Sequence, residues 1–207
     1  MDASGFVSLS EVVPDLLLDM RYYSTYNFIG RRVDGYEMNV ALMAREGADA
    51  LKIAASRARE MGYRLKILDA YRPQRALDCF VRWVEDEQDV LSKPWFYPET
   101  EKSRLYELDF IGRRSAHSRG SAVDLTLLDM RTGVDADMGG PFDFFGARSN
   151  YAFDGLTGEQ ADNRRRLREL MTGCGFLPLE SEWWHFKLAR EPYPDTYFNF
   201  PVRWPIE

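Results

Sequence analysis

The chain has 207 residues, of which 45% are hydrophobic and 29% charged, and its formal net charge is -6. This length suits one domain with a substantial core, and the composition is that of a soluble globular protein rather than a disordered chain. The negative charge argues against a nucleic-acid partner, because phosphate contacts need a basic face. We therefore predict one domain over residues 1–207, and we interpret the local basic run at Arg164–Arg168 as a solvated helix face.

The N-terminal segment predicts neither a secretory signal nor a membrane span. It is acidic where a signal peptide would be basic, and Glu11, Pro14 and Asp15 interrupt its apolar stretch. Cys79 and Cys174 are far apart and in no metal-ligand pattern, so we expect reduced thiols rather than a disulfide scaffold. These features predict a cytoplasmic protein without a membrane partner and leave its oligomeric state open.

The first half of the chain predicts two helices separated by a strand. Apolar residues recur at helical spacing over residues 40–61, and Gly62 can end that helix. Residues 64–69 alternate in part between apolar and polar side chains, which favours a short strand. Pro73 can then open a second helix in its first turn, running toward Asp89.

The second half predicts further strands and a third helix. The clearest strand covers residues 121–128, where Val, Leu and Leu alternate with Ala, Asp and Thr. Residues 129–158 show little periodicity and predict a long loop, which at this length is often functional. A helix is expected over residues 159–172, and residues 183–188 are β-prone. This order predicts an α+β fold with a mainly antiparallel central sheet flanked by helices.

The two histidines of the chain, His117 and His185, are its most informative residues. His117 and Asp124 are seven residues apart, which on one straight strand would place them on opposite faces. Residues 118–120 can supply a turn between them, since glycine tolerates a positive φ. With that turn, the imidazole and the carboxylate can converge on one side of the strand.

The segment Glu182-Trp183-Trp184-His185 can supply a third ligand. Three protein ligands with a fourth position open to water are typical of catalytic zinc, whereas structural zinc is usually closed by four ligands, mostly Cys. Glu182 is then the natural group for proton transfer. A regular strand would place Glu182 and His185 on opposite faces, so Glu182 must project from a turn or a bulge.

Each of these residues also has a simpler interpretation. A single histidine is more often structural than a metal ligand, and Asp124 can be an ordinary carboxylate on the polar face of a strand. Glu182 can be a surface charge. Arg72, where a strand meets a helix, can stabilise an oxyanion or merely pair with a carboxylate such as Asp69.

The motif Ser115-x-His117-x-x-Gly120-x-Ala122-x-Asp124, followed by Glu182-Trp183-Trp184-His185, resembles the signature of zinc D-amino-acid peptidases. This superfamily includes D-alanyl-D-alanine carboxypeptidases and the Hedgehog signalling domain. Within it, the chain looks most like the D-alanyl-D-alanine dipeptidases of the VanX type, known from vancomycin resistance. The likeness covers nearly the whole chain through further blocks: Asp19-Met20-Arg21-Tyr22, Asn27-Phe28, Tyr71-Arg72-Pro73-Gln74-Arg75-Ala76, Met138-Gly139 and Phe142-Asp143-Phe144-Phe145.

The resemblance implies a site on the sheet that holds one Zn²⁺ per chain. It assigns His117, Asp124 and His185 to the metal. It assigns Glu182 to general base and acid catalysis, and Arg72 to the oxyanion. Less directly, it implies substrate contacts, at the carboxylate for Ser115 and near the free ammonium for Tyr22 and Asp143.

The reaction that the resemblance implies is zinc-dependent hydrolysis of the dipeptide D-Ala-D-Ala to two D-alanines, a metalloprotease activity linked to peptidoglycan and antibiotic resistance. Two alternatives are a D,D- or L,D-carboxypeptidase acting on cell-wall peptides and a non-catalytic, zinc-stabilised binding module. The missing export signal counts against the first alternative. The presence of Glu182 and Arg72 counts against the second.

Overall fold

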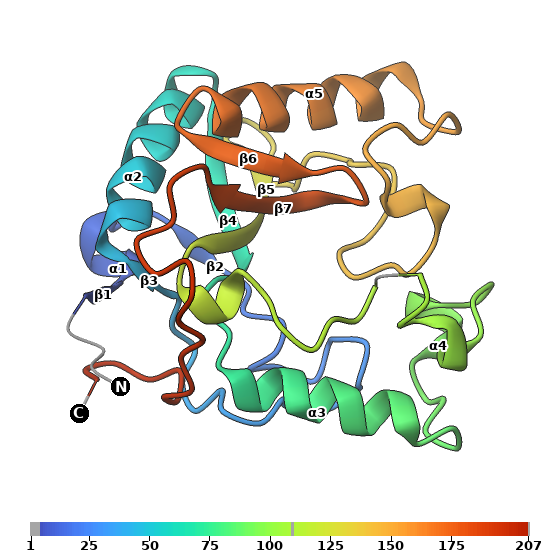
Figure 1. Ribbon diagram of the computed structural model, residues 1–207. Coiled ribbons are helices and arrows are strands. Elements are labelled where there is room, and N and C mark those ends of the chain that lie inside the picture. Colours follow the sequence, from blue (N-terminus) through green and yellow to red (C-terminus); the bar gives the residue numbers. More distant parts are fainter. Residues whose placement is uncertain (1–4, 109, 207) are drawn as a thin grey trace.

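The computed structural model describes residues 5–108 and 110–206, and a five-stranded sheet lies at its centre (Figure 1). The strand order is β2-β4-β5-β7-β6, in which β2 runs parallel to β4 and each later pairing is antiparallel. A separate two-stranded sheet pairs β1 with β3. The strands are β1 (Phe6–Ser8), β2 (Leu17–Leu18), β3 (Leu42–Ala44), β4 (Tyr63–Asp69), β5 (Ala122–Asp129), β6 (Phe176–Leu179) and β7 (Glu182–Leu188).

Helices flank the central sheet. Helix α2 packs on β4, helix α5 packs on β6, and the two helices also contact one another. Figure 1 shows α3 on the other side of the sheet, below the strands, with α4 beside its end. No helix in the described part of the chain is both long and apolar enough to cross a membrane. The helical segments are α1 (Leu9–Val12), α2 (Arg45–Glu60), α3 (Gln74–Glu85), α4 (Lys93–Phe96) and α5 (Gly158–Thr172), with 3₁₀ turns η1 (Lys102–Arg104), η2 (His117–Arg119) and η3 (Ala147–Ser149).

The predicted α+β fold with a mainly antiparallel sheet is confirmed, while several element boundaries differ. The predicted helix over residues 40–61 begins only at Arg45, because residues 42–44 are fully buried and pair with β1. Helix α3 begins after Pro73, whose backbone is extended, and it ends at Glu85. The periodicity of the sequence did not reveal the short strands β1, β2, β3 and β6.

The middle of the sheet packs through a face of buried apolar side chains. Leu65 and Ile67 of β4 lie opposite Leu127 and Leu125 of β5, and all four side chains are at most 1% exposed. Burying such a side chain contributes about 1.5–3 kcal/mol. Alternation along β5 places Asp124 on the opposite face. The apolar packing therefore fixes the strand that carries this carboxylate.

The pairing of β6 with β7 contains the irregularity that Glu182 requires. From Phe176 to Pro178 the register is regular, but Leu179 then pairs with Glu182 rather than continuing the ladder. The additional residues of β7 form a bulge, which re-aims side chains and bends the strand. Glu182 therefore lies on the same side of the strand as His185. The sequence analysis required a turn or a bulge at this position, and the register shift supplies it.

The chain between His117 and Asp124 turns at Gly120. Gly120 has φ +70°, a left-handed conformation that glycine adopts without penalty. A Cβ atom at this position would lie 2.4 Å from the ring of Phe6. That ring is buried and packs edge-on against Tyr71, Phe198 and Phe200, so it cannot move aside.

We predict that Gly120→Ala lowers the free energy of unfolding by at least about 3 kcal/mol, because overpacking adds to the strain of the positive φ. Gly133 is the matched control, since it has the same φ of +70° but a Cβ atom added there would meet nothing within 4 Å. Gly133→Ala should cost only about 1 kcal/mol. Urea unfolding of both variants measures the difference, and equal losses would contradict the role assigned to Phe6.

Candidate metal centre

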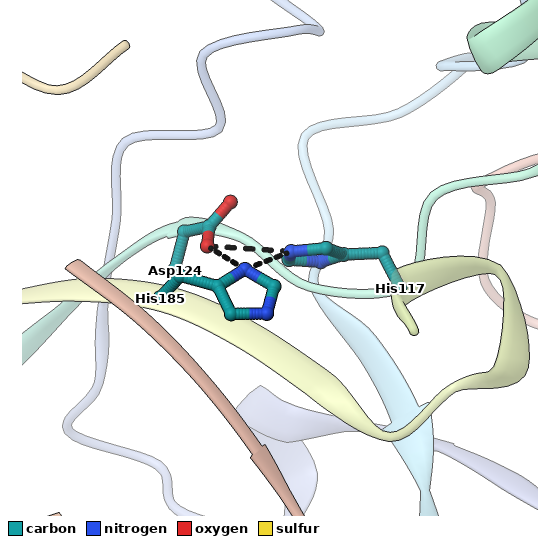
Figure 2. Close-up of side chains that lie close together, drawn as sticks. All are labelled: His117, Asp124 and His185. Atoms are coloured by element: carbon teal, nitrogen blue, oxygen red, sulfur yellow. Dashed lines mark hydrogen bonds and ion pairs between the residues drawn. The ribbon is translucent and has the colours of Figure 1, made fainter. Parts of the chain in front are cut away.

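Three side chains from separate segments converge at one end of the sheet. His117 comes from η2, Asp124 from β5 and His185 from β7, and the register places Asp124 directly opposite His185. Figure 2 shows the three side chains pointing toward one another. The distance from Nε2 of His117 to Nδ1 of His185 is 3.1 Å, and Oδ1 of Asp124 lies 3.3 Å and 3.1 Å from these two nitrogens.

These distances fit a single tetrahedral zinc ion. Zinc–nitrogen and zinc–oxygen bonds of about 2.0–2.2 Å place neighbouring ligand atoms about 3.3–3.5 Å apart. Nδ1 of His117 lies 2.6 Å from the carbonyl oxygen of Ala70, so we assign its proton to that nitrogen. Nε2 is then a lone-pair donor facing the Asp124 carboxylate. Two such groups repel unless a cation or a shared proton lies between them.

Burial and charge favour the protonation states that metal binding needs at two of the three side chains, His117 and Asp124. Burial lowers the pKa of His117 and so favours its neutral ring. Burial would raise the pKa of Asp124, but its interactions with His117 and His185 hold this pKa well below the ordinary value. Burial would lower the pKa of His185, but the hydrogen bond to Asp124 and the negative charges of Asp124 and Glu182 together raise it. A bound cation would displace the proton from His185.

Glu182 lies beside this cluster, with Oε2 3.7 Å from Nδ1 of His185. Burial, together with the negative charge of Asp124, raises the pKa of Glu182 to about 7. A carboxyl group of this pKa can both accept and donate a proton near neutral pH, which is what a general base and acid must do. The geometry therefore suits the role that the sequence predicted for Glu182.

Arg72 is held by two buried carboxylates. Its Nε donates to Oδ2 of Asp69 at 2.9 Å, and its Nη2 donates to Oδ2 of Asp124 at 3.2 Å. The hydroxyl of Tyr36 also donates to Asp69, at 2.7 Å. Arg72 thus pairs with Asp69, and because the pair is buried it holds the guanidinium at the cavity.

The predicted substrate contacts face the same space. The hydroxyl of Tyr22 donates to Oδ2 of Asp143 at 2.9 Å, and burial raises the pKa of Asp143 well above its ordinary value. Ser115 accepts a hydrogen bond from the backbone N–H of His117 at 3.2 Å. One cavity of about 250 Å³ is lined by all eight residues that the sequence singled out: Tyr22, Arg72, Ser115, His117, Asp124, Asp143, Glu182 and His185.

Sequence reasoning missed the residues that support this cavity. Arg164 was predicted to be solvated, and this prediction is wrong, since its side chain is 2% exposed. It donates to the carbonyl oxygens of Met138, Arg148 and Asn150 and so holds both sides of the loop that carries Asp143. The sequence gives no signal for this role, nor for the contact of Tyr36, because the partners are backbone carbonyls or distant residues.

Comparisons with known proteins show the family of the chain. A family model described as D-ala-D-ala dipeptidase, Peptidase_M15, matches residues 2–203. A D-alanyl-D-alanine dipeptidase of Enterococcus faecalis is 43% identical over 96% of this chain and 98% of its own length, and one of Streptomyces coelicolor is 40% identical over 95% and 98%. The family match gives the class of the protein, a peptidase, and the convergent side chains give it a candidate metal centre. The chain belongs to the D-Ala-D-Ala dipeptidase family.

The raised pKa of Glu182 predicts a pH-dependent effect of Glu182→Gln on stability in the presence of a chelator. The folded state holds this proton more tightly than the unfolded state, so the wild type loses stability as pH rises from 4.5, the ordinary value, to about 7. The free energy of unfolding of the variant minus that of the wild type should grow across this window and level off outside it.

The matched control is Glu180→Gln, since Arg168 lowers the pKa of this exposed carboxylate. Its effect should be small and of opposite sign. Urea unfolding at a series of pH values measures both differences. A difference for Glu182→Gln that stays constant with pH would contradict the raised pKa.

Proposed function

We propose that the chain hydrolyses D-Ala-D-Ala to two D-alanines with one Zn²⁺ held by His117, Asp124 and His185. Family membership supports the class of substrate. The observation that carries the proposal is the convergence of these three ligand atoms beside Glu182 in a small cavity with charged groups of both signs. Zinc at this position would supply Lewis acidity, which polarises a carbonyl group and acidifies water.

The residues of the chain would move the protons and stabilise the charge. Glu182 takes a proton from the attacking water and gives it to the leaving amine, without which an amide is cleaved slowly. Arg72, fixed by Asp69, presents its guanidinium to the oxygen on which negative charge develops. A pre-positioned donor of this kind is typically worth about 10²–10³ in rate.

The cavity suits a substrate that is charged at both ends. The carboxyl group of Asp143, with Tyr22, would receive the ammonium group, and Ser115 would contact the carboxylate. A volume of about 250 Å³ is below the range of about 300–1,000 Å³ that holds drug-sized ligands. A longer peptide lacks the free ammonium at this position and would leave a buried carboxyl group without its partner.

We predict that Glu182→Gln retains zinc but lowers turnover of D-Ala-D-Ala by about 10²–10⁴, because only the proton carrier is lost. His117→Ala should instead lose the metal, because two ligands hold zinc too weakly. Zinc content by atomic absorption and turnover by release of D-alanine measure the two effects. Glu180→Gln, two residues away at the surface, is the control, and near-normal turnover in Glu182→Gln would refute the mechanism.

A panel of substrates separates the dipeptidase from its alternatives. The proposal predicts turnover of D-Ala-D-Ala, and a kcat/KM at least about 10²-fold lower for its N-acetylated form and for pentapeptides ending in D-Ala-D-Ala, because each lacks the free ammonium. A D,D- or L,D-carboxypeptidase would prefer a longer peptide. A zinc-stabilised binding module would cleave none of them.

A further inference from the structure

The carboxylate of Glu191 connects several segments just outside the metal centre. Glu191 follows β7 and accepts hydrogen bonds from Nε and Nη2 of Arg119 at 2.6 Å and 2.8 Å. It also accepts one from Oγ of Ser121 at 2.5 Å and one from Nζ of Lys187 at 3.2 Å. Its side chain is only 11% exposed, so these four contacts replace most of its contact with water.

Each donor lies close in the chain to a different metal ligand. Arg119 is two residues after His117, Ser121 is three residues before Asp124, and Lys187 is two residues after His185. Arg119 ends the 3₁₀ turn η2, Ser121 lies just before β5, and Lys187 lies near the end of β7. Through the side chains of Arg119, Ser121 and Lys187, the Glu191 carboxylate therefore connects the stretches of chain that carry the three ligands.

His117 is the ligand whose position depends most on the hydrogen bonds to Glu191. Asp124 and His185 lie opposite one another in the sheet, so the strand register fixes their separation. His117 lies outside the sheet, in η2, which ends at the left-handed Gly120. The bidentate pair of Arg119 with Glu191 links the end of this turn to the segment that follows β7.

The Glu191 carboxylate stays ionised, so its hydrogen bonds do not change with pH near neutrality. Burial would raise the pKa of Glu191, but hydrogen bonds from Arg119 and Ser121 hold it at about 2. The carboxylate therefore stays charged at neutral and mildly acidic pH. The hydroxyl of Tyr197 accepts a further bond from Nη1 of Arg119, at 3.1 Å, which fixes the guanidinium from its other side.

We propose that Glu191 is a positioning residue for the metal centre, which through Arg119 and Ser121 holds the His117 turn at the distance from Asp124 and His185 that the cation requires. This role rests on the metal site of the proposed function but not on its substrate. Groups that orient metal ligands typically change metal affinity by about 10–100-fold when they are replaced.

The test is the zinc affinity of Glu191→Gln, measured by competition with a chromogenic chelator. The variant keeps the size of the side chain and loses its charge, so the bidentate pair weakens and zinc should bind at least about tenfold more weakly. The visible spectrum of the Co²⁺-substituted protein should also change, since it reports the geometry of the ligands. A loss of general stability alone would not alter this spectrum.

Asp15→Asn is the matched control, because Asp15 accepts a comparable bidentate pair from Arg59 outside the cavity lining. Its zinc affinity and Co²⁺ spectrum should equal those of the wild type. Should Glu191→Gln fail to fold, Ser121→Ala and Arg119→Lys each remove part of the same network and should show smaller losses of affinity in the same direction.

These measurements distinguish a failure of the positioning role of Glu191 from a failure of the proposed function. A wild type that binds zinc while Glu191→Gln binds it within about twofold, with an unchanged Co²⁺ spectrum, would overturn the positioning role and leave the proposed function intact. A wild type that binds neither metal would refute the metal centre of the proposed function and the role of Glu191 with it.

Discussion

The site depends on three electron-pair donors, the ring nitrogens of His117 and His185 and a carboxylate oxygen of Asp124. The fold holds these atoms within 3.1–3.3 Å of one another. The lone pairs of two imidazole nitrogens and a carboxylate oxygen repel at this separation unless a proton or a metal cation lies between them, and burial makes the repulsion stronger. The apolar face of β4 and β5 and the register of β5 with β7 fix two of the donors. The left-handed turn at Gly120 brings the third from outside the sheet.

The surroundings of these donors contain several buried acidic side chains. Four buried or largely buried carboxyl groups, those of Asp69, Asp124, Asp143 and Glu182, lie around the guanidinium of Arg72. Burial raises the pKa of three of them, Asp69, Asp143 and Glu182. A site of this kind is suited to cations, and a divalent metal together with the ammonium group of a small peptide would supply them.

The elements that could be predicted from the sequence are those with a strong local hydrophobic periodicity. Alternation along residues 121–128 revealed β5 within one residue, and the conflict between Glu182 and His185 on a regular strand correctly required an irregularity at that point. The register shift, the strand order and the two-stranded sheet depend on pairing between distant segments, which periodicity does not encode. The roles of Arg164 and Glu191 could not be predicted for the same reason, because their hydrogen-bond partners become neighbours only on folding.

We propose that two imidazoles and one carboxylate surround one cation. The zinc K-edge X-ray absorption spectrum of the zinc-loaded protein tests this directly. We expect one zinc per chain with nitrogen and oxygen neighbours at about 2.0–2.2 Å and the outer-shell scattering of two imidazole rings. A sulfur neighbour at about 2.3 Å, or the scattering of fewer than two imidazoles, would contradict it.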